Sequence, residues 1–123
     1  MQLETLAVID APSLAPDDRP IDLVHLARTT MGDRSLEREV LQLFDRQSTL
    51  LIARMRAAAP GGIAYLAHTM KGSARGIGAW RVARAAEALE LAGGADDTAR
   101  ALDQLAAASN EACALIAELL RAN

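Results

Sequence analysis

Aromatic residues and cysteine are nearly absent from this chain. Its 123 residues include one Phe, one Trp, one Tyr and one Cys. A single cysteine excludes an internal disulfide and any metal site built from cysteines, and the helical spacing of its neighbours predicts that Cys113 is buried. Hydrophobic residues still make up 51% of the chain. Most of them are Ala and Leu, which favour helices over strands. The composition predicts an all-α protein.

Long apolar runs are missing as well. No stretch approaches the roughly 18–20 consecutive apolar residues that a membrane-spanning helix needs. The first 20 residues contain Pro12, Pro16 and Pro20 and lack the basic segment and apolar run of a signal peptide. We therefore expect a cytoplasmic protein without a membrane segment. Its length predicts one domain over residues 21–123, preceded by a flexible arm at residues 1–20.

Acidic residues are absent from the middle of the chain. The net charge of −3 argues against nucleic acid as the main partner. Between Asp45 and Glu87, however, there is no acidic residue, and all the charged side chains are basic: Arg46, Arg54, Arg56, Lys71, Arg75, Arg81 and Arg84. This segment predicts a positive surface suited to a phosphoryl group or an acidic protein. Ordinary solvated helix faces are the alternative interpretation.

Glycines and prolines divide the sequence into five predicted helices, at 22–30, 35–58, 63–75, 79–92 and 96–121. Asp22 is a candidate cap for the first of them. The apolar face expected for the 35–58 helix consists of Leu36, Val40, Leu43, Phe44, Leu50 and Leu51. Because the connections between the four longer helices are short, neighbours should be antiparallel. We expect an up-down-up-down four-helix bundle with a short N-terminal helix.

The 63–75 helix presents His68 nearly opposite its apolar stripe. An exposed imidazole is partly neutral at cellular pH, so it can attack phosphorus and later release the phosphoryl group to another acceptor. Gly72 leaves room one turn along the helix. Lys71 and Arg75 provide positive charge for the phosphoryl oxygens. This face is the candidate functional site.

Glu90 falls within the inward stripe of the following predicted helix. A carboxylate on an apolar face is costly unless it finds a hydrogen-bonding partner. Glu90 could reach across the hairpin and accept a hydrogen bond from one nitrogen of His68. Such a bond would fix the tautomer and leave the other nitrogen free to react. The alternative is an edge position from which the carboxylate reaches solvent.

The run His68-Thr-Met-Lys71-Gly72-Ser73-Ala74, followed by Gly78-Ala79, resembles the signature of histidine-containing phosphotransfer (HPt) domains of bacterial phosphorelays. The layout of residues 21–121 resembles that family as well. The resemblance implies that His68 accepts the phosphoryl group on its outward nitrogen. It further implies that Lys71 offsets phosphoryl charge, that Gly72 gives access and that Glu90 orients the histidine.

The resemblance also implies partners and the absence of some activities. The expected partners are a response-regulator receiver domain and a hybrid histidine kinase, with Mg²⁺ supplied by the receiver and no cofactor in this chain. No ATP binding and no autonomous kinase activity are expected. Arg75, Ser73 and Trp80 are candidate partner contacts. Trp80 lies off the inward stripe of its helix, so a half-buried position in the bundle is equally open.

Other functions fit the residues less well. A metal site at His68 has no second ligand at suitable spacing, and Ser73 or Cys113 has no partners for nucleophilic hydrolysis. A DNA-binding helix-turn-helix would explain the Gly-Ile-Gly turn before Trp80, but it leaves Gly72 and Glu90 unexplained. A non-catalytic helical module that binds a kinase or dimerises stays open. We expect a monomer, because one bundle can use every predicted apolar stripe.

Overall fold

The computed structural model describes residues 19–122 and contains five α-helices and no strand in that range. They are α1 (Leu23–Thr29), α2 (Arg34–Ala57), α3 (Pro60–Ile77), α4 (Trp80–Glu90) and α5 (Ala95–Ala122). The predicted all-α fold is confirmed. Apart from Arg19 and Pro20, the predicted arm lies outside the described residues. Within residues 19–122, no helix combines the length and the apolar character needed to cross a membrane.

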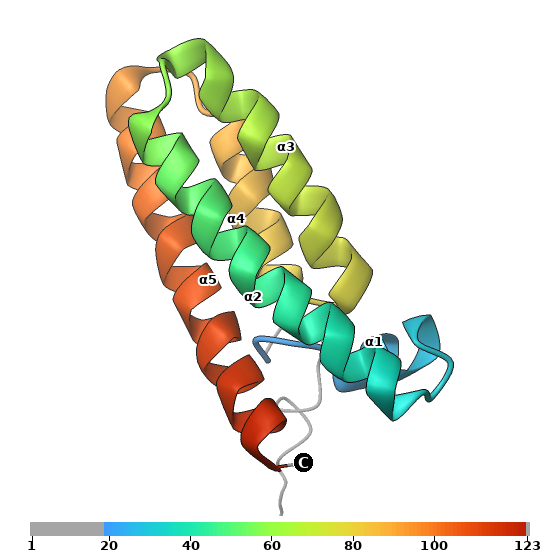
Figure 1. The fold of residues 1–123 in the computed structure, drawn as a ribbon. Coiled ribbons are helices and arrows are strands. Elements are labelled where there is room, and N and C mark those ends of the chain that lie inside the picture. The colour runs from blue at the N-terminus through green and yellow to red at the C-terminus, as the bar shows by residue number, and fades with distance from the viewer. Residues whose placement is uncertain (1–18, 123) are drawn as a thin grey trace, which may run out of the picture.

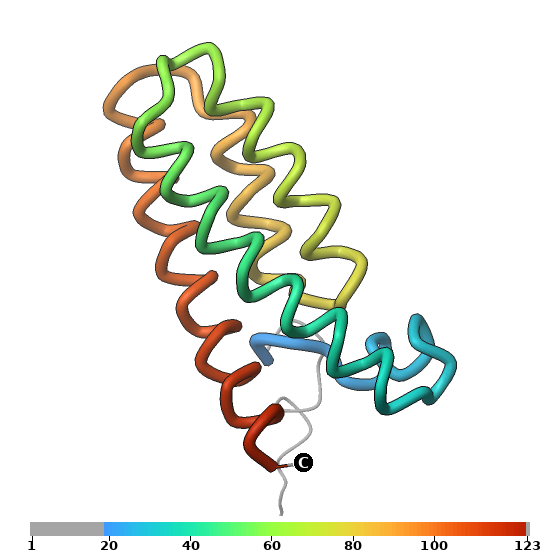
Figure 2. Tube along the Cα trace, viewed as in Figure 1, coloured from blue at the N-terminus to red at the C-terminus, as the bar shows by residue number. Residues whose placement is uncertain are grey.

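The four long helices form a bundle in which each helix runs back alongside the one before it (Figure 1). α3 packs against α2 and α4, and α5 closes the bundle by packing against α4 and α2. The short helix α1 lies at the end of the bundle where α3 turns into α4, as the Cα trace also shows (Figure 2). The chain therefore presents α3 with a long helix on each side and one face open.

The core is made of a few large side chains and many alanines. Met55, Met70, Leu105 and Ile116 are fully buried, and each buried side chain of this size contributes roughly 1.5–3 kcal/mol. Between α3 and α4 the buried positions are mostly small: Ala67, Ala74, Ala79, Ala83 and Ala86. Small side chains let the two helix backbones approach closely. The α3–α4 hairpin is therefore a tightly packed unit.

Two predicted breaks are in fact helical. Helix α3 begins at Pro60, so Gly61 and Gly62 lie in its first turn, not in a loop. Proline is favourable there because its fixed φ suits the first helical position and its missing N–H would have no partner. At the other end, Gly76 is still helical. Only Gly78, with a φ of 80°, adopts the left-handed conformation that ends α3.

The predicted apolar face of α2 is partly wrong. Phe44, Leu51 and Met55 are buried, but Leu43 and Leu50 are 55% and 52% exposed. They lie about 100° or more around the helix from the buried stripe, which is too far to reach the core. Leu43 lines a surface groove shared with α3. These two leucines therefore belong to the surface beside α3.

A small polar contact joins α2 to α5 within the bundle. The Ser48 hydroxyl is buried and donates to the Asp45 carbonyl at 3.1 Å. It also lies 3.4 Å from Sγ of Cys113. Cys113 is half-buried, less than the sequence predicts, and burial raises the pKa of its thiol. A thiol with a raised pKa is a poor nucleophile at neutral pH.

Helix α1 is fastened to the α3–α4 turn by the residues around Asp22. The Asp22 side chain caps α1 by accepting from the His25 backbone N–H at 3.1 Å, which confirms the predicted cap. The Asp22 backbone N–H donates to the Gly78 carbonyl at 2.8 Å. The Trp80 indole Nε1–H donates to Asp22 Oδ2 at 3.0 Å, and its ring packs edge-on against His25. Trp80 is thus half-buried in a structural contact.

Replacing Gly78 with alanine should destabilise the protein. A Cβ at this position would lie 2.9 Å from the Asp22 carbonyl oxygen, on a residue with positive φ. We expect the free energy of unfolding to fall by about 1–3 kcal/mol in urea titrations followed by circular dichroism. Gly76→Ala is the matched control, since a Cβ there meets nothing within 4 Å; it should raise stability by up to about 1 kcal/mol. Equal stability of Gly78→Ala and wild type would contradict the close packing of α1.

Trp80→Phe should lower stability in a pH-dependent way. The indole N–H, more than any other group, lowers the pKa of Asp22 below its ordinary 3.8. A lowered carboxyl pKa stabilises the folded state above the ordinary value, and this contribution is lost as the pH falls through the lowered one. We expect Trp80→Phe to cost about 1 kcal/mol at neutral pH. The difference from wild type should shrink in acid. A difference that is constant with pH would mean that only ring packing was lost.

Candidate functional site

His68 lies midway along the open face of α3. Its side chain is 65% exposed. The buried stripe of the same helix consists of Ala67, Met70, Ala74 and Ile77, so the histidine is on the solvent side, as its helical phase predicts. The exposed residues that share this face are mostly small: Gly61, Ala64, Tyr65, Gly72, Arg75 and Gly76.

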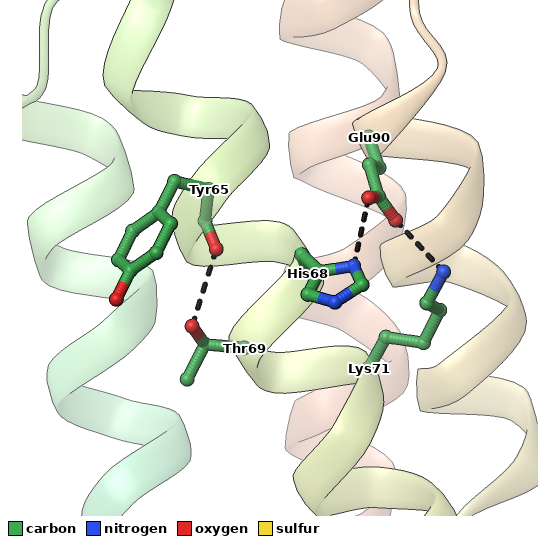
Figure 3. Close-up of polar contacts among 5 residues, drawn as sticks. All are labelled: Tyr65, His68, Thr69, Lys71 and Glu90. Carbon is green, nitrogen blue, oxygen red and sulfur yellow. Dashed lines mark hydrogen bonds and ion pairs between the residues drawn. The ribbon is translucent and has the colours of Figure 1, made fainter.

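Glu90, the last residue of α4, holds one side of the imidazole. Its Oε2 lies 2.8 Å from Nδ1 of His68 (Figure 3). The antiparallel hairpin brings the two residues together although they are 22 positions apart in the sequence. The predicted contact across the hairpin is confirmed. The alternative, a carboxylate turned to solvent, is wrong, since the Glu90 side chain is only 24% exposed.

Lys71 lies on the same side of His68 and also contacts Glu90. Its Nζ is 2.9 Å from Oε1 of the carboxylate, and its side chain is only 13% exposed. Figure 3 shows the lysine and the histidine on opposite oxygens of the one carboxyl group. The sequence predicts a solvent-facing cation at this position. In the structure the ammonium is instead partly buried and forms an ion pair, so its predicted role toward a phosphoryl group stays a prediction.

The ion pair with Lys71 keeps the Glu90 carboxylate ionised. The Lys71 ammonium, more than the His68 ring, lowers the pKa of Glu90 below its ordinary 4.5, although desolvation acts in the opposite direction. Glu90 is therefore ionised at neutral pH, and an ionised carboxylate can only accept hydrogen bonds. Nδ1 of His68 must carry the hydrogen. In the neutral ring Nε2 then has a free lone pair, and it lies on the side of the ring away from Glu90 (Figure 3).

Gly72 leaves the helix backbone bare next to the ring. A Cβ at this position would meet nothing within 4 Å, so no neighbour in the described part of the chain requires a glycine. A glycine inside a helix costs about 1 kcal/mol relative to alanine. The space beside His68 is open to a second molecule.

The other predicted site residues lie further away. Arg75 is exposed on the same face, about 10 Å along the axis from His68 at 1.5 Å per residue. Ser73 lies on the α2 side, in a groove of about 250 Å³ that it shares with Leu43, Gln47 and Gly76. Trp80 follows the far end of α3, about 15 Å from His68 along the axis. The structure therefore does not bring Trp80 to the histidine.

Tyr65 is not among the site residues predicted from the sequence, although it lies on the same face of the helix as His68. It lies one turn before the histidine, and 73% of its surface is exposed. Its ring extends toward α2, while Lys71 extends toward α4 (Figure 3). Leu43 of α2 lines the groove between α2 and α3, and Leu50, two helical turns further along α2, is exposed as well. We call these three residues the apolar strip.

The structure argues against the helix-turn-helix alternative. A recognition helix needs its first residues free to enter a DNA groove. In this protein α4 begins with Trp80, which bonds to Asp22, and Arg81, whose Nη1 lies 3.1 Å from Glu111 of α5. Both side chains are engaged within the bundle.

Comparison with known families agrees with the geometry of the site. The model of the Hpt domain matches residues 35–122, from the first turn of α2 to the end of α5. This range includes His68, Lys71 and Glu90 and leaves out α1. No curated protein and no solved structure matches the chain. Since the matched range covers well over half of the sequence, the chain belongs to the Hpt domain family.

Proposed function

We propose that this protein is a phosphorelay intermediate that carries a phosphoryl group on Nε2 of His68. The group comes from the aspartyl phosphate of a receiver domain or hybrid kinase and passes to an aspartate of a response-regulator receiver. Hpt domains perform histidine phosphotransfer in two-component phosphorelays, where they interact with receiver domains and kinases. The observation that carries the proposal is the orientation of His68, with Nδ1 held by Glu90 and an exposed Nε2.

Phosphoryl transfer to Nε2 of His68 needs no general base from this chain. The lone pair of Nε2 attacks phosphorus, the N–P bond forms, and the P–O bond to the donor aspartate breaks. The aspartate leaves with the electron pair as a carboxylate. Because the ring hydrogen is on Nδ1, Nε2 has no proton to lose before the attack. The reverse step returns the phosphoryl group to a second aspartate and restores neutral His68.

The phosphoryl oxygens require positive charge and space. Arg75 is exposed on the same face of α3, and Lys71 lies beside the ring through its contact with Glu90. Gly72 lets a second backbone approach the phosphorus in line with Nε2. The chain itself needs no cofactor in this proposal, because the receiver supplies Mg²⁺ with its acidic site.

The α2 side of His68 offers the docking surface for the receiver. The three residues of the apolar strip are each more than half exposed. The groove between α2 and α3 continues from this strip past Gly76. Apolar contacts at the centre of an interface with charged groups around them are typical of specific docking. We propose that a receiver domain covers this strip while its aspartate reaches His68.

Phosphotransfer should depend on His68. A receiver domain from the same organism, phosphorylated in the presence of Mg²⁺, is mixed with the wild-type protein or with His68→Gln. We expect acid-labile label on the wild type and none on the variant, with circular dichroism showing equal helicity. Equal labelling of both proteins would overturn the assignment of His68. Stable binding without labelling of either protein would favour the non-catalytic interaction module.

Leu50→Asp should weaken docking without unfolding the protein. Leu50 is 52% exposed, so the change costs little stability, but it places an unpaired carboxylate in the apolar strip. We expect about tenfold weaker binding of the receiver, equivalent to about 1.4 kcal/mol. Ala107→Asp, on an exposed position of α5, adds the same charge elsewhere and should leave binding unchanged. Equal effects of the two variants would show that charge alone, and not this surface, matters.

A further inference from the structure

The ion pairs on the surface of this protein are unevenly distributed. Arg56, Arg81 and Arg100 each lie within 3.4 Å of a carboxylate, and in all three cases that carboxylate belongs to α5. Exposed pairs of this kind stabilise a fold little. They do cancel most of the field that each charge would extend into solvent, because the two opposite charges are close together. These three cations therefore attract a distant partner only weakly.

Three other arginines, all on α2 and α3, have no matching carboxylate. Arg46 and Arg54 are exposed on α2, and Arg75 is exposed on α3. None of them forms an ion pair with another residue of the described range 19–122. The amino-acid sequence explains why, since α3 contains no acidic residue and α2 contains none after Asp45. We call these three arginines the basic patch.

The basic patch lies close to the residues proposed above to meet a receiver domain. Arg46 and Arg54 are one helical turn before and after Leu50, each about 6 Å from it along the axis of α2. Arg75 is about 10 Å from His68 along the axis of α3. At physiological salt the Debye length is about 8 Å. An acidic group that approaches Leu50 is therefore attracted by both arginines of α2.

The carboxylate nearest to His68 does not offset this positive charge. Oε1 of Glu90 lies 2.9 Å from the ammonium of Lys71, so the two charges largely cancel at a distance. The field that reaches solvent from this face is that of the basic patch. A field of one sign attracts a partner of the opposite sign before the two proteins touch, and it can raise an association rate about 10- to 1000-fold.

We propose that the basic patch attracts an acidic receiver domain to the apolar strip and acts on the rate of association. This inference rests on the proposed function, because it takes the receiver as the partner. A receiver that supplies Mg²⁺ needs carboxylates to hold the ion, which makes its phosphorylation site the complementary surface. Exposed arginines at the edge of an interface contribute little once the complex has formed. The apolar strip holds the docked receiver.

The test measures the association and dissociation rate constants of the full-length protein with a receiver domain from the same organism, by stopped-flow fluorescence with a dye on the receiver. At about 0.1 M salt, where the Debye length is about 10 Å, Arg46→Gln/Arg54→Gln should associate about fivefold more slowly than wild type. Its dissociation rate constant should change by less than about twofold. At about 1 M salt the two proteins should associate equally fast, because the Debye length is then about 3 Å.

Arg100→Gln/Arg121→Gln is the matched control. It removes the same amount of positive charge, but from exposed positions of α5. Its association rate constant at about 0.1 M salt should stay within about twofold of wild type, since α5 lies more than one Debye length from the basic patch across the bundle. All four arginines are exposed, so both double variants should keep the wild-type helicity in circular dichroism.

The proposal is overturned if the α2 variant dissociates faster but associates at the wild-type rate, since its arginines would then act only as contacts. It is also overturned if the control slows association by the same factor, since net charge alone would explain the effect. Labelling of His68 by a receiver whose association does not respond to salt would reject the attraction and keep the proposed function. Salt-dependent association as expected, without labelling, would support the attraction and reject phosphotransfer.

Discussion

The register of α3 against α4 decides whether His68 has an oriented ring. The 2.8 Å contact with Glu90 joins residues on two helices, and a shift of one residue in either helix would turn one of the side chains away by about 100°. Two features set that register. The left-handed Gly78 ends α3, and the Ala79 N–H donates to the Ala74 carbonyl at 2.8 Å. The buried alanines between the helices then let the two backbones pack closely in that register.

The far end of the hairpin is stabilised by a part of the chain outside the matched family range. Asp22 and Trp80 hold α1 against the turn, and the family match begins only at residue 35. α1 therefore supports the same turn that sets the hairpin register. It does so about 15 Å from His68 along the helix axis, where it leaves the open face clear. Trp80, which the sequence offers as a partner contact, serves this support.

Most of what the sequence predicts about the site comes from helical phase, which tells on which side of its helix each residue lies. It places His68 on the solvent side and Glu90 on the side of α4 that faces α3, so the sequence offers their contact, and the structure decides it against a carboxylate turned to solvent. It could not place the end of Lys71, because a flexible lysine stem can extend to solvent or fold over a neighbouring helix. A stripe of leucines likewise predicts which side of α2 is apolar but not how much of it a neighbour covers. Leu43 and Leu50 lie at the edge of that side, too far around α2 to reach the core, and stay at the surface.

On the open face of α3, the groups that contact the His68 ring lie on the α4 side, and the surface that a partner can reach lies on the α2 side. The α4 side of His68 contains the carboxylate and the ammonium, which orient the ring and are largely enclosed. The α2 side contains the apolar strip, and Gly72 and Gly76 leave the helix surface bare. Each of these helical glycines costs about 1 kcal/mol and meets no neighbour in residues 19–122. If a receiver domain docks as proposed, it can reach Nε2 from the α2 side without disturbing the Lys71–Glu90 ion pair.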